Sequence, residues 1–293
     1  MEFWTNSFSS VARNERISSR VFVSVVGRNA EICAKRSSLS PRQTSAADST
    51  LHIEPGAQGV YTLLLVVQQE EPAFVLARAD SPQQTVTLCA LPGSLRVSAP
   101  SGTTTLAECA LSAGAGRAAQ LLVGTVATGE TAAPALHYIA ATPATWADCA
   151  GRTASARIDT ASLLDAAART RLGYGEDPIA VCTAAQASEL IAQLQAALPG
   201  AGEGCMARAA VWAAFLRQDP ALLAGLPDGL RSRSARLLTD LLAADLNALG
   251  ETLAYLSART ALTIDYTTAA VAAARGGVQL TEEGMAAVCA LLL

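Results

Sequence analysis

The chain has 293 residues, of which 51% are hydrophobic, 16% are charged and 4% are aromatic, and its formal net charge is −4. This balance excludes an intrinsically disordered chain, which combines low hydrophobicity with high charge. The acidic net charge also excludes a globally basic nucleic-acid-binding protein, and the length suits one large domain or two ordinary ones.

The N-terminal half has the pattern of β-structure. Short runs of β-branched and hydrophobic residues recur about every ten residues, separated by turns that contain proline or glycine. The strand candidates cover residues 20–26, 51–53, 60–67, 73–77, 85–89, 95–98, 103–111, 119–125 and 135–140. Such a series without helical periods predicts an antiparallel sandwich or barrel. We expect Phe74, Leu76, Val86, Leu88, Leu95 and Val97 to face one core.

From about residue 160 the apolar residues follow a helical period. Ser162 and Thr183 are candidate N-caps, and the Asp219-Pro220 pair is typical of a helix start. The helix candidates begin near residues 162, 183, 206, 220, 230, 267 and 281. The fold class predicted is therefore an all-β jelly-roll or sandwich followed by an all-α helical domain, with a β domain over 1–147 and a helical bundle over 158–293.

The sequence offers little chemistry that points to catalysis. Its seven cysteines contain no C-x-x-C pair, its only histidines are His52 and His137, and it contains neither a G-x-S-x-G nor a P-loop motif. We therefore predict no catalytic residue, no metal site and no cofactor. The absence of a signal peptide and of an 18-residue apolar stretch predicts a nuclear or cytoplasmic protein without a membrane partner.

Four segments carry a resemblance to a known family. They are the opening Met1-Glu2-Phe3-Trp4, the strand candidates 73–77 and 83–88, and the pair of strands around a glycine turn at 94–106. Over about residues 1–111 the order and spacing of these segments resemble the nucleoplasmin-like domain. The resemblance implies an eight-stranded jelly-roll that assembles into a ring, usually a pentamer, and an association with histones or chromatin.

Several side chains are candidates for interaction. Phe3 and Trp4 are either subunit-contact aromatics or core residues of a first strand. Glu70 and Glu71 are either a contact for a basic partner or a solvated turn. The arginines 231, 233 and 236 either meet a phosphate or an acidic partner or lie on a solvated helix start, and on a helix Arg233 and Arg236 share a face.

The function predicted is that of a non-catalytic oligomerisation scaffold that binds protein partners and does not read DNA sequence. In this interpretation the stripe Leu237, Leu241 and Leu246 lies in the helical core or beside a partner surface. The alternative is a structural or assembly subunit of a virion or multi-subunit complex. A third hypothesis is an enzyme whose cleft holds His52 or His137 beside a carboxylate or thiol.

Overall fold

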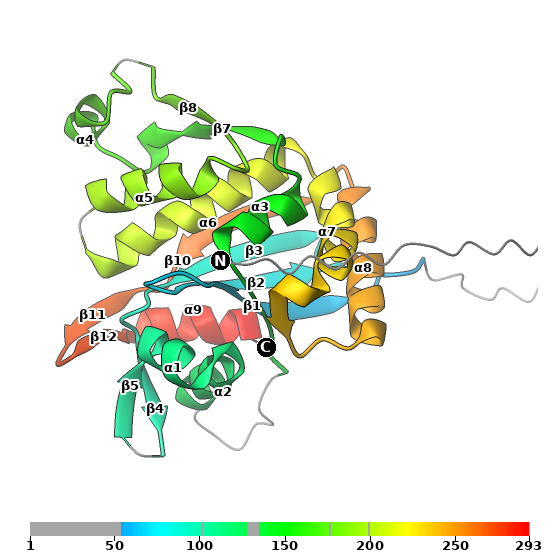
Figure 1. Cartoon of the computed structure of the whole chain (residues 1–293), viewed down its shortest axis with the longest axis horizontal. Helices are drawn as coiled ribbons and strands as arrows, with labels where there is room; N and C mark the ends of the chain where they lie inside the picture. Colours follow the sequence, from blue (N-terminus) through cyan, green and yellow to red (C-terminus); the bar gives the residue numbers. More distant parts are fainter. Residues whose placement is uncertain (1–53, 101, 128–134, 176, 199, 293) are drawn as a thin grey trace, which may run out of the picture. The chain divides into compact units, whose positions relative to one another are not determined.

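The computed structural model describes residues 54–292, except residues 101, 128–134, 176 and 199. These residues belong to one compact unit, Leu51–Leu293. Its centre is a six-stranded mixed sheet with the strand order β10-β3-β2-β1-β6-β9 (Figure 1). The strands are β1 (Val60–Val67), β2 (Ala73–Asp80), β3 (Thr85–Leu91), β6 (His137–Ala141), β9 (Leu237–Thr239) and β10 (Thr263–Thr268).

The sheet combines local and distant pairings. Strands β1, β2 and β3 form an antiparallel meander, with Leu64 opposite Leu76 and Leu76 opposite Cys89. Strand β6 runs parallel to β1, and β10 runs parallel to β3, with Ile264 opposite Val86. Strand β9 closes the other edge by pairing antiparallel with β6. Residues from both halves of the chain therefore build one sheet.

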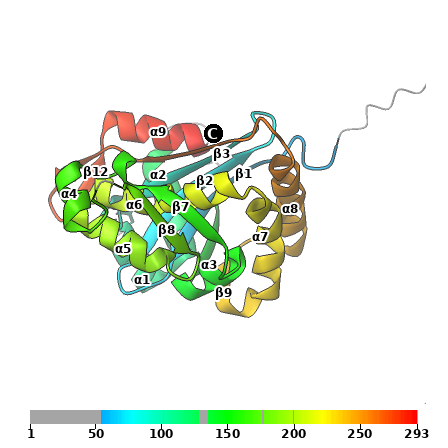
Figure 2. The ribbon, with the colours of Figure 1, turned by 90° about the horizontal axis from the view of Figure 1, so that it is seen from above.

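Helices cover both faces of the sheet (Figures 1 and 2). One face packs against α1 (Leu106–Ala113), α2 (Ala115–Val126) and α9 (Glu282–Leu292). The other face packs against α6 (Ala201–Gln218), α7 (Ala221–Ser232) and α8 (Ala243–Ser257), with α3 (Pro143–Ala150) against α7. The result is a three-layer α/β/α arrangement with a separate apolar core on each side of the sheet.

A third core lies on the far side of α6. Here α5 (Ala187–Ala197) and the two-stranded sheet of β7 (Ser155–Asp159) and β8 (Ile179–Thr183) pack against α6, together with α4 (Ala166–Arg171) and a 3-10 turn at Thr160–Ser162. Two further pairs are β4 (Arg96–Ala99) with β5 (Gly102–Thr105), and β11 (Val271–Ala274) with β12 (Gly277–Leu280). A second 3-10 turn covers Ser234–Arg236.

The prediction of an all-β first half is wrong. Strand β1 matches its predicted range, but the predicted strand 103–111 contains the start of α1. Thr105 and Glu108 form a capping box there: the Glu108 amide donates to Thr105 Oγ1 at 3.1 Å, and the Thr105 amide donates to Glu108 Oε2 at 3.0 Å. The predicted strand 119–125 lies in α2, because Ala118, Leu122 and Val126 bury one helical face.

The prediction of an all-α second half is also wrong. The leucine-rich stretch 230–249 is interrupted, because Leu237 and Leu238 are extended and pair with β6. Leu241 precedes α8, so the stripe of Leu237, Leu241 and Leu246 does not lie on one helix. The predicted helix at 267–275 is replaced by parts of β10 and β11, whereas the predicted last helix is confirmed by α9.

The predicted single core is divided by the sheet. Phe74 and Leu76 face the helices α1, α2 and α9, whereas Val86 and Leu88 face the opposite layer. Most residues of the central strands are buried on both sides, which is typical of a sheet with helices on both faces and not of a sandwich.

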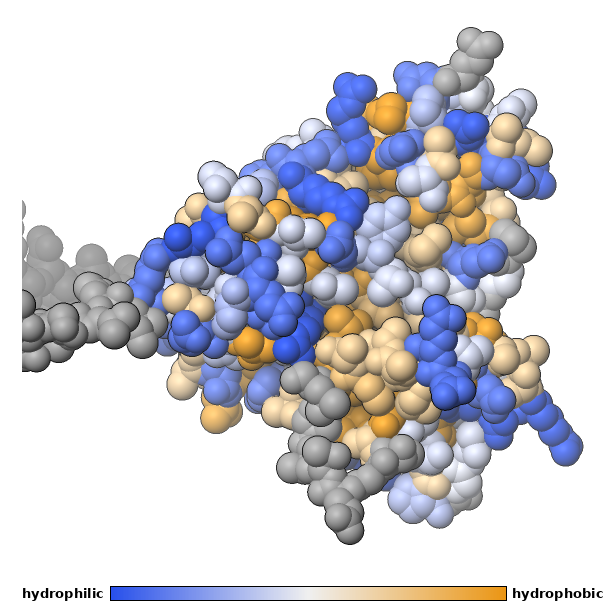
Figure 3. All heavy atoms as spheres, turned by 180° about the vertical axis from the view of Figure 1, so that it is seen from behind, coloured by the Kyte–Doolittle hydropathy of each residue, from blue (hydrophilic) through white to orange (hydrophobic). Residues whose placement is uncertain are grey.

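Exposed large hydrophobic side chains do not gather on one helix of the described chain. They are Val60, Leu111, Val181, Leu238 and Leu242, which lie in or beside five different elements. From behind, hydrophilic residues cover much of the surface, and mildly hydrophobic residues gather below the centre of the view (Figure 3). Isolated exposed apolar residues are normal for folded proteins, so the structure gives no support to a helical partner stripe.

Candidate substrate-binding site

An apolar cavity of about 160 Å³ lies between the sheet and the helices of one layer. Leu63 and Leu88 form part of its floor, and Trp146 of α3 and Trp212 of α6 form part of its wall. The two indole rings lie 5.6 Å apart between centroids and are tilted by 48°. The Trp146 Nε1 donates to the Val66 carbonyl at 3.3 Å, which fixes this ring against the sheet.

Small side chains leave the space open. Five alanines line the cavity: Ala77 and Ala79 of β2, Ala147 and Ala150 of α3, and Ala187 of α5. An alanine contributes one methyl group where a leucine or phenylalanine would fill the gap between sheet and helix. A cavity of about 150 Å³ lined by apolar side chains binds a benzene-sized group. The cavity can therefore hold an apolar group or a short part of an apolar chain.

Two arginines contribute to the lining: Arg78 of β2, which pairs with Asp80, and Arg208 of α6, which is buried. Arg208 is 4% exposed, and its Nε has no hydrogen-bond partner among the described residues. None of the ion pairs between described residues includes it. Burial lowers the pKa of the Arg208 guanidinium to about 10, and the neighbouring Cys205 thiol acts in the opposite direction.

The positive charge on Arg208 makes the cavity selective for ligands that carry an anionic group. A group with a pKa of about 10 is protonated at neutral pH, so the side chain carries a positive charge in an apolar setting. A buried charge without a partner costs several kcal/mol, and an anion that enters its neighbourhood offsets this cost. The cavity thus combines an apolar lining with an unpaired cation, which suits an amphiphile with an anionic group.

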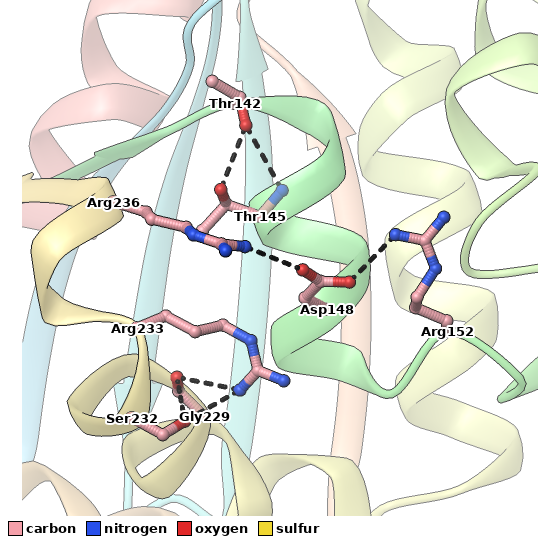
Figure 4. Close-up of polar contacts among 8 residues, drawn as sticks. All are labelled: Thr142, Thr145, Asp148, Arg152, Gly229, Ser232, Arg233 and Arg236. Carbon is pink, nitrogen blue, oxygen red and sulfur yellow. Dashed lines mark hydrogen bonds and ion pairs between the residues drawn. The ribbon is translucent and has the colours of Figure 1, made fainter. Parts of the chain in front are cut away.

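A group of arginines lies beside α3 and the end of α7 (Figure 4). Asp148 of α3 accepts a hydrogen bond from Arg152 Nη1 at 3.0 Å and forms an ion pair with Arg236 at 3.6 Å. Arg233 donates through Nη1 to the Gly229 carbonyl at 3.3 Å and to Ser232 Oγ at 2.8 Å. We call Arg152, Arg233 and Arg236 the arginine patch.

The structure brings together only part of the predicted interaction residues. Arg233 and Arg236 lie in the arginine patch (Figure 4), whereas Arg231 pairs with Asp228 and Asn247. Glu70 and Glu71 are exposed in the turn between β1 and β2. Phe3 and Trp4 lie outside the described residues.

His137 has a carboxylate partner, but the pair lies outside the lining of the apolar cavity. His137 Nδ1 lies 3.3 Å from Asp240 Oδ2, and Asp240 also accepts a hydrogen bond from the Tyr138 amide at 2.9 Å. Neither residue of the pair lines the apolar cavity. His52 lies outside the described residues, and among the residues that the structure describes no three His, Cys, Asp or Glu side chains are placed to hold a metal ion.

The most informative residue, Arg208, was missed at the level of sequence. It stands alone among small and apolar residues in the segment Met206–Leu216, which was assigned to a helix core. A single charge in such a segment is a detectable signal, because charged side chains are almost never fully buried without a partner. Asp148 and Arg152 were missed because they lie between the two predicted domains, 1–147 and 158–293.

The chain matches no known family pattern over its sequence, and no curated protein resembles it in sequence. Solved structures resemble its fold. A candidate transcription regulator from Eubacterium siraeum is 13% identical with a TM-score of 0.62, over 86% of this chain and 97% of that one. TagT of Bacillus subtilis bound to LI-WTA is 10% identical with a TM-score of 0.54, over 82% and 91%. A LytR-Csp2A-Psr enzyme from Actinomyces oris is 15% identical with a TM-score of 0.53, over 81% and 91%.

These likenesses overturn the nucleoplasmin-like interpretation. The fold is a mixed α/β fold like that of LytR-Csp2A-Psr proteins, and not a jelly-roll. The predicted chromatin or histone partners, pentameric ring and nuclear location followed from the nucleoplasmin-like resemblance, and they are wrong with it. The virion or assembly-subunit alternative finds no support among them.

The prediction of a non-catalytic scaffold is also contradicted, because the similar structures include an enzyme. In the described part of the chain no helix has the length and apolar character needed to cross a membrane.

Proposed function

We propose that this chain is an enzyme of the LytR-Csp2A-Psr type that acts on a cell-wall polymer carried by an anionic lipid. The observation that carries the proposal is Arg208, a buried guanidinium without a partner among the described residues, in the lining of an apolar cavity. The likeness in fold to a LytR-Csp2A-Psr enzyme and to TagT bound to LI-WTA supports the assignment to this reaction class.

The cavity suits the lipid part of such a substrate. Its floor is the apolar face of the sheet, and its walls include two tryptophans and several alanines. At about 160 Å³ it takes only a short length of chain next to the anionic group. The remaining chain would leave through the open side of the cavity.

Arg208 suits the phosphate that joins the lipid to the polymer. In the transfer we propose, an acceptor hydroxyl attacks the phosphorus at the end of the polymer, the new oxygen–phosphorus bond forms, and the bond to the lipid phosphate breaks. The acceptor proton leaves to solvent, and the lipid phosphate departs with the bonding electrons. A positive charge in a low-dielectric setting stabilises the negative charge that develops on this leaving group.

Binding can be tested with the intrinsic fluorescence of the cavity. A full-length Trp4→Phe variant leaves only Trp146 and Trp212, and both of these line the cavity. We expect octyl phosphate to change this fluorescence at a concentration about tenfold lower than 1-octanol, because a hydrogen bond to a charged group contributes about 1.5–3 kcal/mol. In the same background, Arg208→Met should remove the preference for the phosphate.

Arg217→Met is the matched control, because Arg217 lies on the same helix but is paired with Asp265 at the surface. Activity is measured as release of lipid phosphate from a lipid-linked wall polymer in the presence of cell-wall fragments. We expect release by the natural chain and little by Arg208→Met. Failure of octyl phosphate and octanol alike to change the fluorescence would contradict the proposed function.

A further inference from the structure

The arginine patch, just after α3 and just after α7, has an excess of positive charge. Arg152 and Arg236 both contact the Asp148 carboxylate, and the Arg233 guanidinium lies close by, in a chain whose net charge is −4 (Figure 4). The side chains of Arg152 and Arg236 are 62% and 69% exposed, so they are accessible to a ligand. We infer that Arg152, Arg233 and Arg236 form a second anion site, distinct from the cavity, that takes phosphate oxygens.

Most of the donors in the patch are free to bind. A guanidinium carries five N–H donors. Among the described residues, Arg236 has only the ion pair with Asp148 at 3.6 Å, and Arg152 donates one hydrogen bond, also to Asp148. Arg233 uses Nη1 for Gly229 and Ser232, which orients its guanidinium beside α3 and leaves its other nitrogens without a partner among them.

Helix α3 separates this site from the cavity. Trp146, Ala147 and Ala150 of α3 line the cavity, whereas Asp148 of the same helix points toward Arg236. The patch and the cavity lining therefore lie on different faces of α3, so the two sites can be filled independently.

The chemistry of the patch favours phosphate. The planar guanidinium fork matches two oxygens of a phosphate group, and several arginines around one space are typical of phosphate recognition. The net positive charge of the patch matches an ion with two or more negative charges. The phosphates could belong to a small ion or to a polymer with repeated phosphate groups, and the inference concerns the phosphate group that both share.

The test is isothermal titration calorimetry of the full chain with inorganic pyrophosphate, at about 50 and 200 mM salt because salt screens such contacts. We expect binding that weakens with salt, and a loss of at least about threefold in affinity in each of Arg236→Gln and Arg233→Gln. Arg231→Gln is the matched control: it removes the same charge from the same segment, but Arg231 pairs with Asp228 and Asn247. The control should bind pyrophosphate like the natural chain.

A second titration with linear polyphosphate distinguishes the two sources. Tighter binding of the long chain than of pyrophosphate indicates a phosphate polymer, and equal affinity per site indicates a small ion. The inference is overturned if neither probe binds, or if Arg231→Gln weakens binding as much as Arg236→Gln. The fluorescence response of the cavity to octyl phosphate should be unchanged in Arg236→Gln, so the result does not depend on the proposed function.

Discussion

Gly229 of α7 lies directly against Cys149 of α3. A Cβ atom on Gly229 would lie 3.0 Å from the Cys149 carbonyl oxygen and 3.1 Å from its Cα atom. Both atoms belong to backbone, which cannot move aside as the end of a flexible side chain can. The glycine therefore sets the distance between the two helices, and with it the approach of Arg233, whose Nη1 donates to the Gly229 carbonyl.

Gly229→Ala should destabilise the fold by about 1–3 kcal/mol, because overpacking at backbone exceeds the gain in helix propensity. Urea unfolding followed by circular dichroism measures the change. Gly225→Ala is the control on the same helix, where a Cβ atom would meet nothing within 4 Å. It should leave stability unchanged or raise it by up to about 1 kcal/mol. Equal effects at the two positions would contradict the close packing of α3 and α7.

Arg208→Met should raise the thermal midpoint of the ligand-free chain. The folded-state pKa of Arg208, about 10, lies below the ordinary 12.5, so the folded state binds this proton less tightly. The resulting penalty, about 3 kcal/mol, is fully present below pH 10 and falls as the pH rises toward 12.5. Calorimetry at pH 7 measures the gain. A lower midpoint than that of the natural chain would mean that Arg208 has a stabilising partner.

Ala77→Val should fill part of the cavity. Ala77 is a buried residue of β2 that lines the cavity. Burial of two added carbon atoms there contributes about 1.5 kcal/mol to the free energy of unfolding. We expect higher stability in urea and weaker binding of 1-octanol. Ala90→Val is the matched control on β3, since Ala90 is fully buried but does not line the cavity. That change should destabilise by about 1–3 kcal/mol through overpacking.

Buried thiols should make the fold sensitive to alkaline pH. Burial raises the pKa of Cys89 from 9.0 to about 12, with a smaller effect of Cys205. The stabilisation that comes from keeping this thiol neutral is complete below pH 9 and is lost as the pH rises toward 12. From pH 7.5 to pH 10 the free energy of unfolding should fall in both proteins. We expect this fall to be about 1.4 kcal/mol smaller in Cys89→Ala than in the natural chain.

The control for this experiment is Val97→Ala, a truncation in the same core without a titratable group. It should lower the free energy of unfolding by a similar amount at both pH values. An equal loss with pH in Cys89→Ala and in the natural chain would show that Cys89 does not contribute to the alkaline sensitivity.

Local features of the fold could be predicted from the sequence, but the way they pair could not. The run Val60–Val67 forms β1 because eight mostly apolar residues end at a polar turn. The Thr105–Glu108 capping box was present in the sequence as a helix start, and the alternation of residues 103–111 concealed it. Two central strands pair in parallel with partners far along the chain, and no local pattern specifies such pairings.

The site shows the same limit. Arg233 and Arg236 could be singled out as a pair, and they do lie together in the patch. Asp148, the acidic partner of Arg236, comes from a helix more than eighty positions earlier, and the cavity is lined by alanines of separate elements. The spacing of residues along the chain predicts neither the pairing with Asp148 nor the cavity, because both depend on the three-layer packing.

The last helix has a consequence for the order in which the molecule can form. Thr62 of β1 and Arg78 of β2 both donate to the Leu291 carbonyl, at 3.0 and 3.2 Å, and Val288 of α9 is fully buried in the core beneath the sheet. Strand β10, which covers the edge of β3, also comes after residue 260. On the ribosome, the central meander must therefore wait with one edge uncovered, and with one face covered only by α1 and α2, until residues 263–292 emerge. Folding of this kind is slow and exposes apolar strands. We therefore expect chaperones to bind the nascent chain.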